Sequence, residues 1–183
     1  MVLRHYQRGG AMARLLGDRY FWHGLEKTRA WREWRLLASL WQQGLPVPRP
    51  LAAHVWHTGV FYRADLITAR IKNSLSLSDT LAKQTLSEKT WRRIGKVIRQ
   101  FHAANVYHAD MNAHNILLDS EQNIYLIDFD KCRLMPDDQQ NATWQETTLQ
   151  RLQRSLNKLR FEDIRFNYAD SNWALFMGGY QNG

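Results

Sequence analysis

The residues that could do chemistry lie in one segment past the middle of the chain. Residues 107–118 read YHADMNAHNILL, and residues 125–130 read YLIDFD. Asp110, Asn115 and Asp128 fall in expected loops between short apolar runs, with Asp110 and Asn115 at the His-x-Asp-x4-Asn spacing. A carboxylate, an amide and a second carboxylate in this order are typical of phosphoryl-transfer sites. The sequence therefore predicts that these residues act on a phosphorylated cofactor.

Each of these residue types suits one part of that chemistry. We expect Asp110 to accept the proton of an attacking hydroxyl, as a general base. We expect Asn115 and Asp128 to hold Mg²⁺, because this hard cation prefers carboxylate and amide oxygens together with phosphates and water. The cation would neutralise the triphosphate of ATP, since catalysis of phosphoryl transfer is mostly positioning and electrostatic stabilisation.

An alternative interpretation is purely structural, because Asp and Asn are common turn formers. For any one of the three residues alone, that interpretation is favoured. The joint pattern favours a catalytic site of the kinase type, because His-x-Asp, the later Asn and the Asp-Phe-Asp run rarely coincide by chance.

The elements around the loop should hold it from both sides. Ser87 is a good helix N-cap, and apolar residues follow it at helical spacing as far as Phe101, just before the loop. The apolar runs 116–118 and 124–127 predict a hairpin that ends at Asp128.

The rest of the chain predicts a mixture of helices and strands. A helix from about residue 28 to 43 should bury a stripe of Trp34, Leu37 and Trp41, and end at Gly44. The other expected elements are a strand at 2–6 followed by a Gly9-Gly10 turn, a hairpin over 55–71 broken at Thr58-Gly59, a short helix starting at residues 76–79, and a helix at 143–159.

This order of elements predicts an α+β fold in two parts. Residues 1–70 would form a partial, β-rich N-terminal lobe of a kinase fold, with a connector near residues 67–75. Residues 71–183 would form a mainly helical C-terminal lobe that carries the catalytic and metal-binding loops.

Composition narrows the class of protein and its partners. The 183 residues are 44% hydrophobic, so a sizeable core is available, and the single Cys132 excludes an intrachain disulfide. No apolar run approaches the ~20 residues that span a bilayer, and the charged first ten residues predict no signal peptide.

The net charge of +8 favours anionic partners such as a nucleotide, a nucleic acid or a membrane surface. Arg stands beside Trp in the run 31–35 and again at 91–93. Such clusters suit a peripheral membrane protein, because Arg binds phosphate and Trp favours the membrane interface. Composition alone would suit RNA equally well.

Beyond the catalytic motif, several segments carry a resemblance to a known family. They are residues 2–10, 31–33, 44–48, 107–118 and 126–131. With these segments the chain resembles the 3-deoxy-D-manno-octulosonic acid kinases, which are lipopolysaccharide-core kinases with a protein-kinase-like fold. The resemblance spans most of the chain, and it makes a nucleic-acid partner unexpected.

The resemblance implies ATP-dependent phosphorylation of a hydroxyl of the sugar acid attached to a lipid A precursor. It implies an anionic glycolipid as acceptor and a peripheral location on the cytoplasmic side of the bacterial inner membrane. Asp110 matches the catalytic aspartate, and Asn115 and Asp128 match the metal-binding positions. Glu33 matches a helix glutamate that pairs with a strand cation, and Arg4 stands where protein kinases carry the phosphate-binding Lys.

The spacing of Glu33 supports an inward position. Glu33 shares a helical face with Ala30, Leu37 and Leu40, so its side chain should point to the core. The alternative is a surface ion pair with Arg29, one turn earlier.

Two departures from the family's pattern are visible. No glycine-rich phosphate loop precedes Val2, so the chain looks short at its N-terminus and should be a poor catalyst as given. Arg4 is not equivalent to Lys, because its planar guanidinium differs from a compact ammonium. His108 and His114 flank the catalytic loop, where we expect them to orient it rather than to carry protons or bind zinc.

Other functions stay open from the sequence. The same motif serves phosphotransferases for another core sugar or for a small molecule such as an aminoglycoside. A protein substrate is disfavoured, because no Ala-Pro-Glu segment follows Asp128 and little room is left for an activation loop. A competitor from another class is a kinase-like binding module that transfers nothing.

Overall fold

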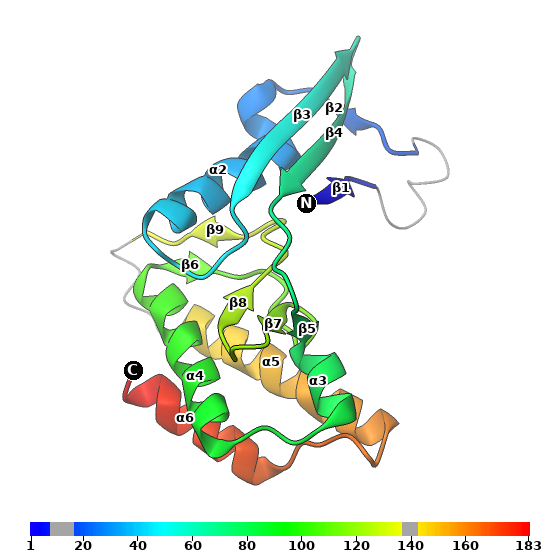
Figure 1. Ribbon diagram of the computed structural model, residues 1–183. Coiled ribbons are helices and arrows are strands. Elements are labelled where there is room, and N and C mark those ends of the chain that lie inside the picture. Colours follow the sequence, from blue (N-terminus) through cyan, green and yellow to red (C-terminus); the bar gives the residue numbers. More distant parts are fainter. Residues whose placement is uncertain (8–16, 137–142) are drawn as a thin grey trace. The chain divides into compact units, whose positions relative to one another are not determined.

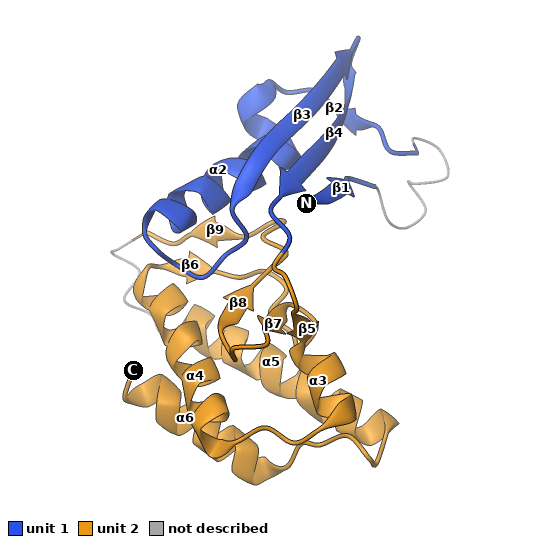
Figure 2. Ribbon diagram, viewed as in Figure 1, with its two compact units in different colours: residues 1–70 blue, residues 71–183 orange. Residues whose placement is uncertain are grey.

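Residues 1–7, 17–136 and 143–183 are described by the computed structural model, which is an α+β structure (Figure 1). The expected Gly9-Gly10 turn lies outside the described residues. The chain divides into two compact units, Met1–Arg70 and Ile71–Gly183 (Figure 2).

Unit 1 is an antiparallel sheet with one long helix. Its central strand β4 pairs with β3 along one edge, and with β1 and β2 at opposite ends of the other edge. The elements are β1 (Val2–His5), β2 (Tyr20–Phe21), the 3-10 helix η1 (Leu25–Lys27), α2 (Arg29–Gln42), β3 (Pro50–Thr58) and β4 (Phe61–Thr68).

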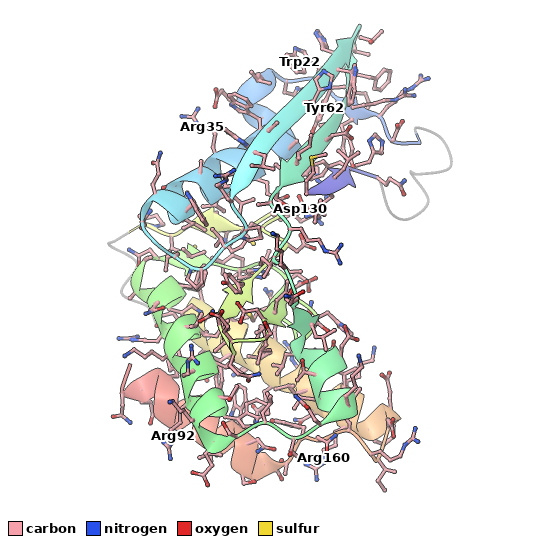
Figure 3. The ribbon with its side chains drawn as sticks, viewed as in Figure 1. Trp22, Arg35, Tyr62, Arg92, Asp130 and Arg160 are labelled. Atoms are coloured by element: carbon pink, nitrogen blue, oxygen red, sulfur yellow. The ribbon has the colours of Figure 1, made fainter. Side chains whose placement is uncertain are left out.

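The hairpin of β3 and β4 was predicted, but its first strand is longer than predicted. Its turn lies where expected, with Gly59 at a φ of +60°, which glycine adopts without steric cost. Strand β3 begins at Pro50, five residues before the predicted start, because an Ala-rich, mostly exposed stretch lacks the alternation that marks a strand. Trp22 and Tyr62, labelled in Figure 3, lie with ring centroids 6.2 Å apart and join the β2 end to β4.

Helix α2 lies almost where predicted, and it buries the face predicted for Glu33 rather than the predicted tryptophan stripe. The buried residues are Ala30, Glu33, Leu37 and Leu40, whereas Trp41 is 47% exposed. The predicted stripe of Trp34, Leu37 and Trp41 was therefore wrong at Trp41. The prediction favoured the large apolar Trp over the smaller side chains that pack on the sheet. Gly44 has a φ of +75° and follows the cap residue Gln43, so it ends the helix in the left-handed conformation.

Unit 2 is mainly helical, with two small sheets of order β5-β7-β8 and β6-β9. Its elements are β5 (Leu75–Ser76), α3 (Leu77–Lys83), α4 (Glu88–Ala103), β6 (Val106–Tyr107), β7 (Ile116–Leu118), β8 (Ile124–Leu126), β9 (Arg133–Leu134), α5 (Thr143–Glu162) and α6 (Asp170–Gln181).

Helix α4 begins with the predicted cap at Ser87, and α3 begins within the predicted residues 76–79, capped by Ser76. The hydroxyl of Ser87 accepts a hydrogen bond from the Thr90 backbone N–H at 3.1 Å, and Ser76 accepts one from Asp79 at 3.0 Å. The apolar face of α4 is fully buried and consists of Trp91, Ile94, Ile98 and Phe101. This buried face packs against α6, β6 and β8.

Helix α6 was not predicted, and it packs along α4 (Figure 1). A Cβ placed on Gly95 of α4 would lie 2.0 Å from the backbone oxygen of Phe176, and one on Gly179 of α6 would lie 2.0 Å from that of Arg92. The two backbones thus approach closely at these glycines. The Gly178-Gly179 pair reads as a helix breaker in sequence, and α6 lacks a clear polar face, so both helix signals were missing.

Among the residues described, no helix is both long enough and apolar enough to cross a membrane.

Candidate active site

The loop between β6 and β7 carries Asp110 and Asn115, and it is closed by its own side chains. The Asn115 side-chain Nδ2 donates a hydrogen bond to the Asp110 carbonyl at 2.8 Å and lies 3.5 Å from the Asp110 carboxylate. The Asn112 side-chain oxygen accepts from the backbone N–H groups of His114 at 2.9 Å and Asn115 at 3.2 Å. These bonds fix the five-residue spacing between Asp110 and Asn115 as one compact turn.

The two residues differ in exposure. Asp110 is exposed, whereas Asn115 is only 8% exposed. Because the Asn115 nitrogen is committed to the Asp110 carbonyl, its side-chain oxygen is the atom left to accept a hydrogen bond or bind a cation.

Asp128 is brought to this loop by the hairpin of β7 and β8. Just past β8, the Ile127 backbone N–H donates to the Asn115 carbonyl at 3.0 Å, which makes Asp128 the next residue along. Asp128 has a φ of +62°, a left-handed conformation that is uncommon outside glycine but tolerated by Asp. The structure therefore places the three predicted residues in two loops of unit 2 that are joined by a backbone hydrogen bond.

His108 ties the catalytic loop to the end of β8. Its Nε2 donates to the Ile127 carbonyl at 3.0 Å, and its ring lies in an edge arrangement with Phe129, with ring centroids 5.2 Å apart. Burial lowers the pKa of His108 below its ordinary value. It outweighs the Ile127 carbonyl and the charges of Asp128 and Asp110, which raise that pKa. A buried, neutral imidazole that bonds a carbonyl holds the loop, as the sequence predicts.

His114 has a different neighbour. Its Nδ1 lies 2.7 Å from the hydroxyl of Ser78 at the start of α3, and the Ser78 backbone N–H donates to the Ala113 carbonyl at 3.1 Å. His114 and its neighbour therefore join the loop to α3.

Helix α5 holds the loop from another side, through residues that the sequence analysis did not identify. The Nη1 atom of Arg151 donates to the Tyr107 hydroxyl and to the Ala109 carbonyl, each at 2.8 Å. The Ala113 backbone N–H donates to the Ser155 hydroxyl at 3.2 Å. The only signal in the sequence was that Arg151 and Ser155 stand four residues apart on the expected helix, which is too weak to single them out.

In unit 1, Glu33 is buried and bonded to β1 and the residue after it. Its carboxylate accepts from Arg4 Nη1 at 3.1 Å and from the Tyr6 hydroxyl at 2.5 Å, and Glu33 is 5% exposed. The predicted pairing of the helix glutamate with the strand cation is present. A solvated position for Glu33, as in a surface pair with Arg29, was the wrong alternative, because the side chain lies in the core.

The described residues contain no group of three or more His, Cys, Asp or Glu side chains that could hold a metal ion by themselves. The oxygens of Asn115 and Asp128 suit a cation that takes its other ligands from phosphate and water, as Mg²⁺ does. The exposed carboxylate of Asp110 is open to a hydroxyl that must lose a proton. The arrangement can therefore support phosphoryl transfer.

Comparison with known proteins agrees with this chemistry. Residues 1–180 match the profile of a protein family described as "Lipopolysaccharide kinase (Kdo/WaaP) family". A 3-deoxy-D-manno-octulosonic acid kinase of Mannheimia succiniciproducens is 43% identical over 185 residues, covering 99% of this chain and 75% of that protein. A protein of the same name from Haemophilus influenzae is 42% identical, covering 98% of this chain and 74% of that protein. Another from Vibrio cholerae is also 42% identical, covering 86% of this chain and 65% of that protein. The chain belongs to the lipopolysaccharide kinase (Kdo/WaaP) family and is a phosphotransferase that acts on a sugar hydroxyl.

Proposed function

We propose that this protein transfers the γ-phosphoryl group of ATP to a hydroxyl of 3-deoxy-D-manno-octulosonic acid linked to a lipid A precursor, in lipopolysaccharide core biosynthesis. The observation that carries the proposal is the closed loop in which Asn115 bonds the carbonyl of Asp110, in a chain about 40% identical to kinases of that name. A kinase family implies the use of ATP.

Asp110 is the proposed general base. Its carboxylate is exposed, while its backbone carbonyl is held by Asn115 and the preceding carbonyl by Arg151. A carboxylate held in one place can orient the sugar hydroxyl and accept its proton as the phosphoryl group arrives.

Asn115 and Asp128 are the proposed Mg²⁺ ligands. The fit rests on the Asn115 oxygen, which its own hydrogen bond leaves available, and on Asp128, which directly follows Ile127, whose backbone N–H donates to the Asn115 carbonyl. The cation, when bound, neutralises charge on the phosphates.

Arg4 is the proposed phosphate contact of unit 1, and Glu33 orients it. The Arg4 side chain is 34% exposed and is held by Glu33 through Nη1, and a guanidinium is a side chain that binds phosphate. Unit 1 and unit 2 would then correspond to the N-terminal and C-terminal lobes of a kinase-like fold.

We also propose peripheral contact with an anionic membrane surface on the cytoplasmic side of the inner membrane. Phe161 and Ile164, at the end of α5, are 92% and 96% exposed. The nearby cations Lys158, Arg160 and Arg165 are each paired with a carboxylate, of Glu162, Asp170 and Asp163. The exposed apolar tip would enter the membrane interface, and attraction to acidic lipids would come from the net charge of +8. That interface is also where a lipid-linked acceptor resides.

The test is a transfer assay with labelled ATP and purified protein. The account expects label on the sugar-acid-linked lipid A precursor and none on the same precursor without the sugar acid. An aminoglycoside as acceptor tests the alternative class of small-molecule phosphotransferase. Labelling of the aminoglycoside and not of the sugar-linked lipid would overturn the proposed function.

A further inference from the structure

A polar groove lies beside Asp110, inside unit 2. It has a volume of about 650 Å³, and its walls are the loop residues 109–112 and His114 and one side of α5. Asp110 is part of its lining, so anything that fills the groove lies next to the proposed base.

The α5 wall of the groove is cationic. Arg151, Arg154 and Lys158 line it, and their spacing of three and four residues places them on one face of the helix. Besides Asp110, Glu162 is the carboxylate in the lining, and it lies 3.7 Å from Lys158 with both side chains more than half exposed. Such an exposed pair is weak and leaves Lys158 able to turn to another anion.

The cationic wall is fixed relative to Asp110. Arg151 donates from Nη1 to the carbonyl of Ala109, the residue before Asp110, and Ser155 accepts from Ala113 on the other side of Asp110. These two bonds set the register between α5 and the loop. Arg154, one residue before Ser155, is exposed, and its Nε donates to the Gln150 carbonyl of the same helix at 3.3 Å.

We propose that this groove is the acceptor subsite, in which Arg154 and Lys158 bind an anionic group of the acceptor while its hydroxyl lies at Asp110. The assignment rests on the proposed function and specifies its acceptor side. A sugar acid carries a carboxylate on the same residue as the hydroxyl to be phosphorylated, and a guanidinium binds a carboxylate or a phosphate through paired N–H groups. Arg151, which is committed to the loop, acts as a positioning residue.

The experiment compares Arg154→Ala and Lys158→Ala with matched controls on α4, Arg92→Ala and Lys96→Ala. Arg92, labelled in Figure 3, and Lys96 are exposed and lie outside the groove. The acceptor is presented in uncharged detergent micelles, so that membrane attraction plays no part. We expect each groove variant to raise the KM for the sugar-lipid acceptor by roughly tenfold or more, with the KM for ATP unchanged. Arg154→Lys should recover part of the loss, and both controls should match the wild type.

Two modified acceptors identify the anionic group. One carries the sugar carboxylate as its methyl ester, and the other has lost the phosphates of its lipid portion. The penalty of the groove variants should vanish with one of them, and that acceptor lacks the group bound in the groove. A penalty that persists with both acceptors would overturn the assignment.

Failure of the two proposals can be told apart. A wild-type enzyme that transfers no phosphate to the sugar-linked lipid contradicts the proposed function itself. A wild-type enzyme that transfers phosphate, together with groove variants whose acceptor KM is unchanged, contradicts the groove alone.

Discussion

The side chain of Asn115 donates a hydrogen bond to the backbone carbonyl of Asp110 at 2.8 Å. Its nitrogen thus closes the loop that presents the proposed base, and its oxygen is the atom that we propose as a Mg²⁺ ligand. The fixed spacing in the His-x-Asp-x4-Asn motif follows from this bond, because a shorter or longer loop would separate the donor from the carbonyl.

The first prediction separates the two tasks of Asn115. Asn115→Ala should weaken Mg²⁺-dependent ATP binding and also lower the free energy of unfolding by roughly 0.5–1.5 kcal/mol, through the lost hydrogen bond. The control is Asn112→Ala, which removes other bonds of the same loop but no proposed ligand. It should lower stability and leave the Mg²⁺ dependence intact.

Asp128→Asn should reduce Mg²⁺-dependent ATP binding further than Asn115→Ala, because it removes a charged oxygen ligand. Titration of ATP at several Mg²⁺ concentrations measures all three variants. Unchanged Mg²⁺ dependence in Asp128→Asn would remove the metal assignment.

The second prediction concerns acid. His102 is 1% exposed, with its Nδ1 lying 2.8 Å from the Tyr180 hydroxyl. Burial, with smaller contributions from the charges of Arg99 and His108, lowers the pKa of His102 to about 4 from an ordinary value of 6.5. Between these two values the unfolded chain binds more protons than the folded one, so stability must fall as the pH falls from 6.5 towards 4.

Between pH 7 and pH 5 this linkage amounts to about 2 kcal/mol for His102. Urea unfolding at both pH values measures it, and a neutral replacement, His102→Gln, should reduce the difference by that amount. An unchanged pH dependence in His102→Gln would show that other groups cause the acid sensitivity.

The third prediction tests the contact between α4 and α6. Gly95→Ala should lower the free energy of unfolding by about 1–3 kcal/mol or more, because the new Cβ would clash with a backbone oxygen that cannot rotate away. The matched control is Gly178→Ala on α6, where the nearest atom, at 2.9 Å, is the flexible end of Arg92. Thermal unfolding of the two variants should differ clearly, and equal melting temperatures would contradict the close approach of the two helices.

The fourth prediction concerns the membrane. Replacing both Phe161 and Ile164 by Ser should weaken sedimentation with anionic vesicles, because the exposed apolar tip is lost. Raising the salt concentration should weaken binding of the wild type too, since screening shortens the reach of surface charge to about 8 Å at physiological ionic strength. Val60→Ser, at an exposed apolar position in the hairpin of unit 1, is the control and should bind as the wild type does. Wild-type binding by the double variant would exclude this tip as the contact.

The sequence predicted the elements that carry strong local signals. The cap at Ser87, the start of α3 within residues 76–79 and the turn at Gly59 lie where expected, because each depends on interactions within a few residues. The two-residue strands β2, β5, β6 and β9 were not predicted, since so short a run has no periodicity and forms only through its distant partner strand.

The candidate site shows the same division. Asp110, Asn115 and Asp128 could be found because their types and spacing are tied to one loop and one hairpin. Arg151 and Ser155 could not be found, because their contacts with the loop join residues about 42 positions apart in the sequence. Such contacts depend on where α5 packs, which no local pattern encodes.

The most direct test of the account is phosphate transfer to the sugar-linked lipid A precursor by Asp110→Asn, with ATP binding measured on the same protein. Asn keeps the size of the side chain but cannot accept the hydroxyl proton as a carboxylate does. We expect turnover to fall by roughly 10²–10⁴-fold while ATP affinity stays within a few-fold of the wild type. Near-normal turnover in Asp110→Asn, with a wild type that phosphorylates the sugar-linked lipid, would contradict the central role of Asp110.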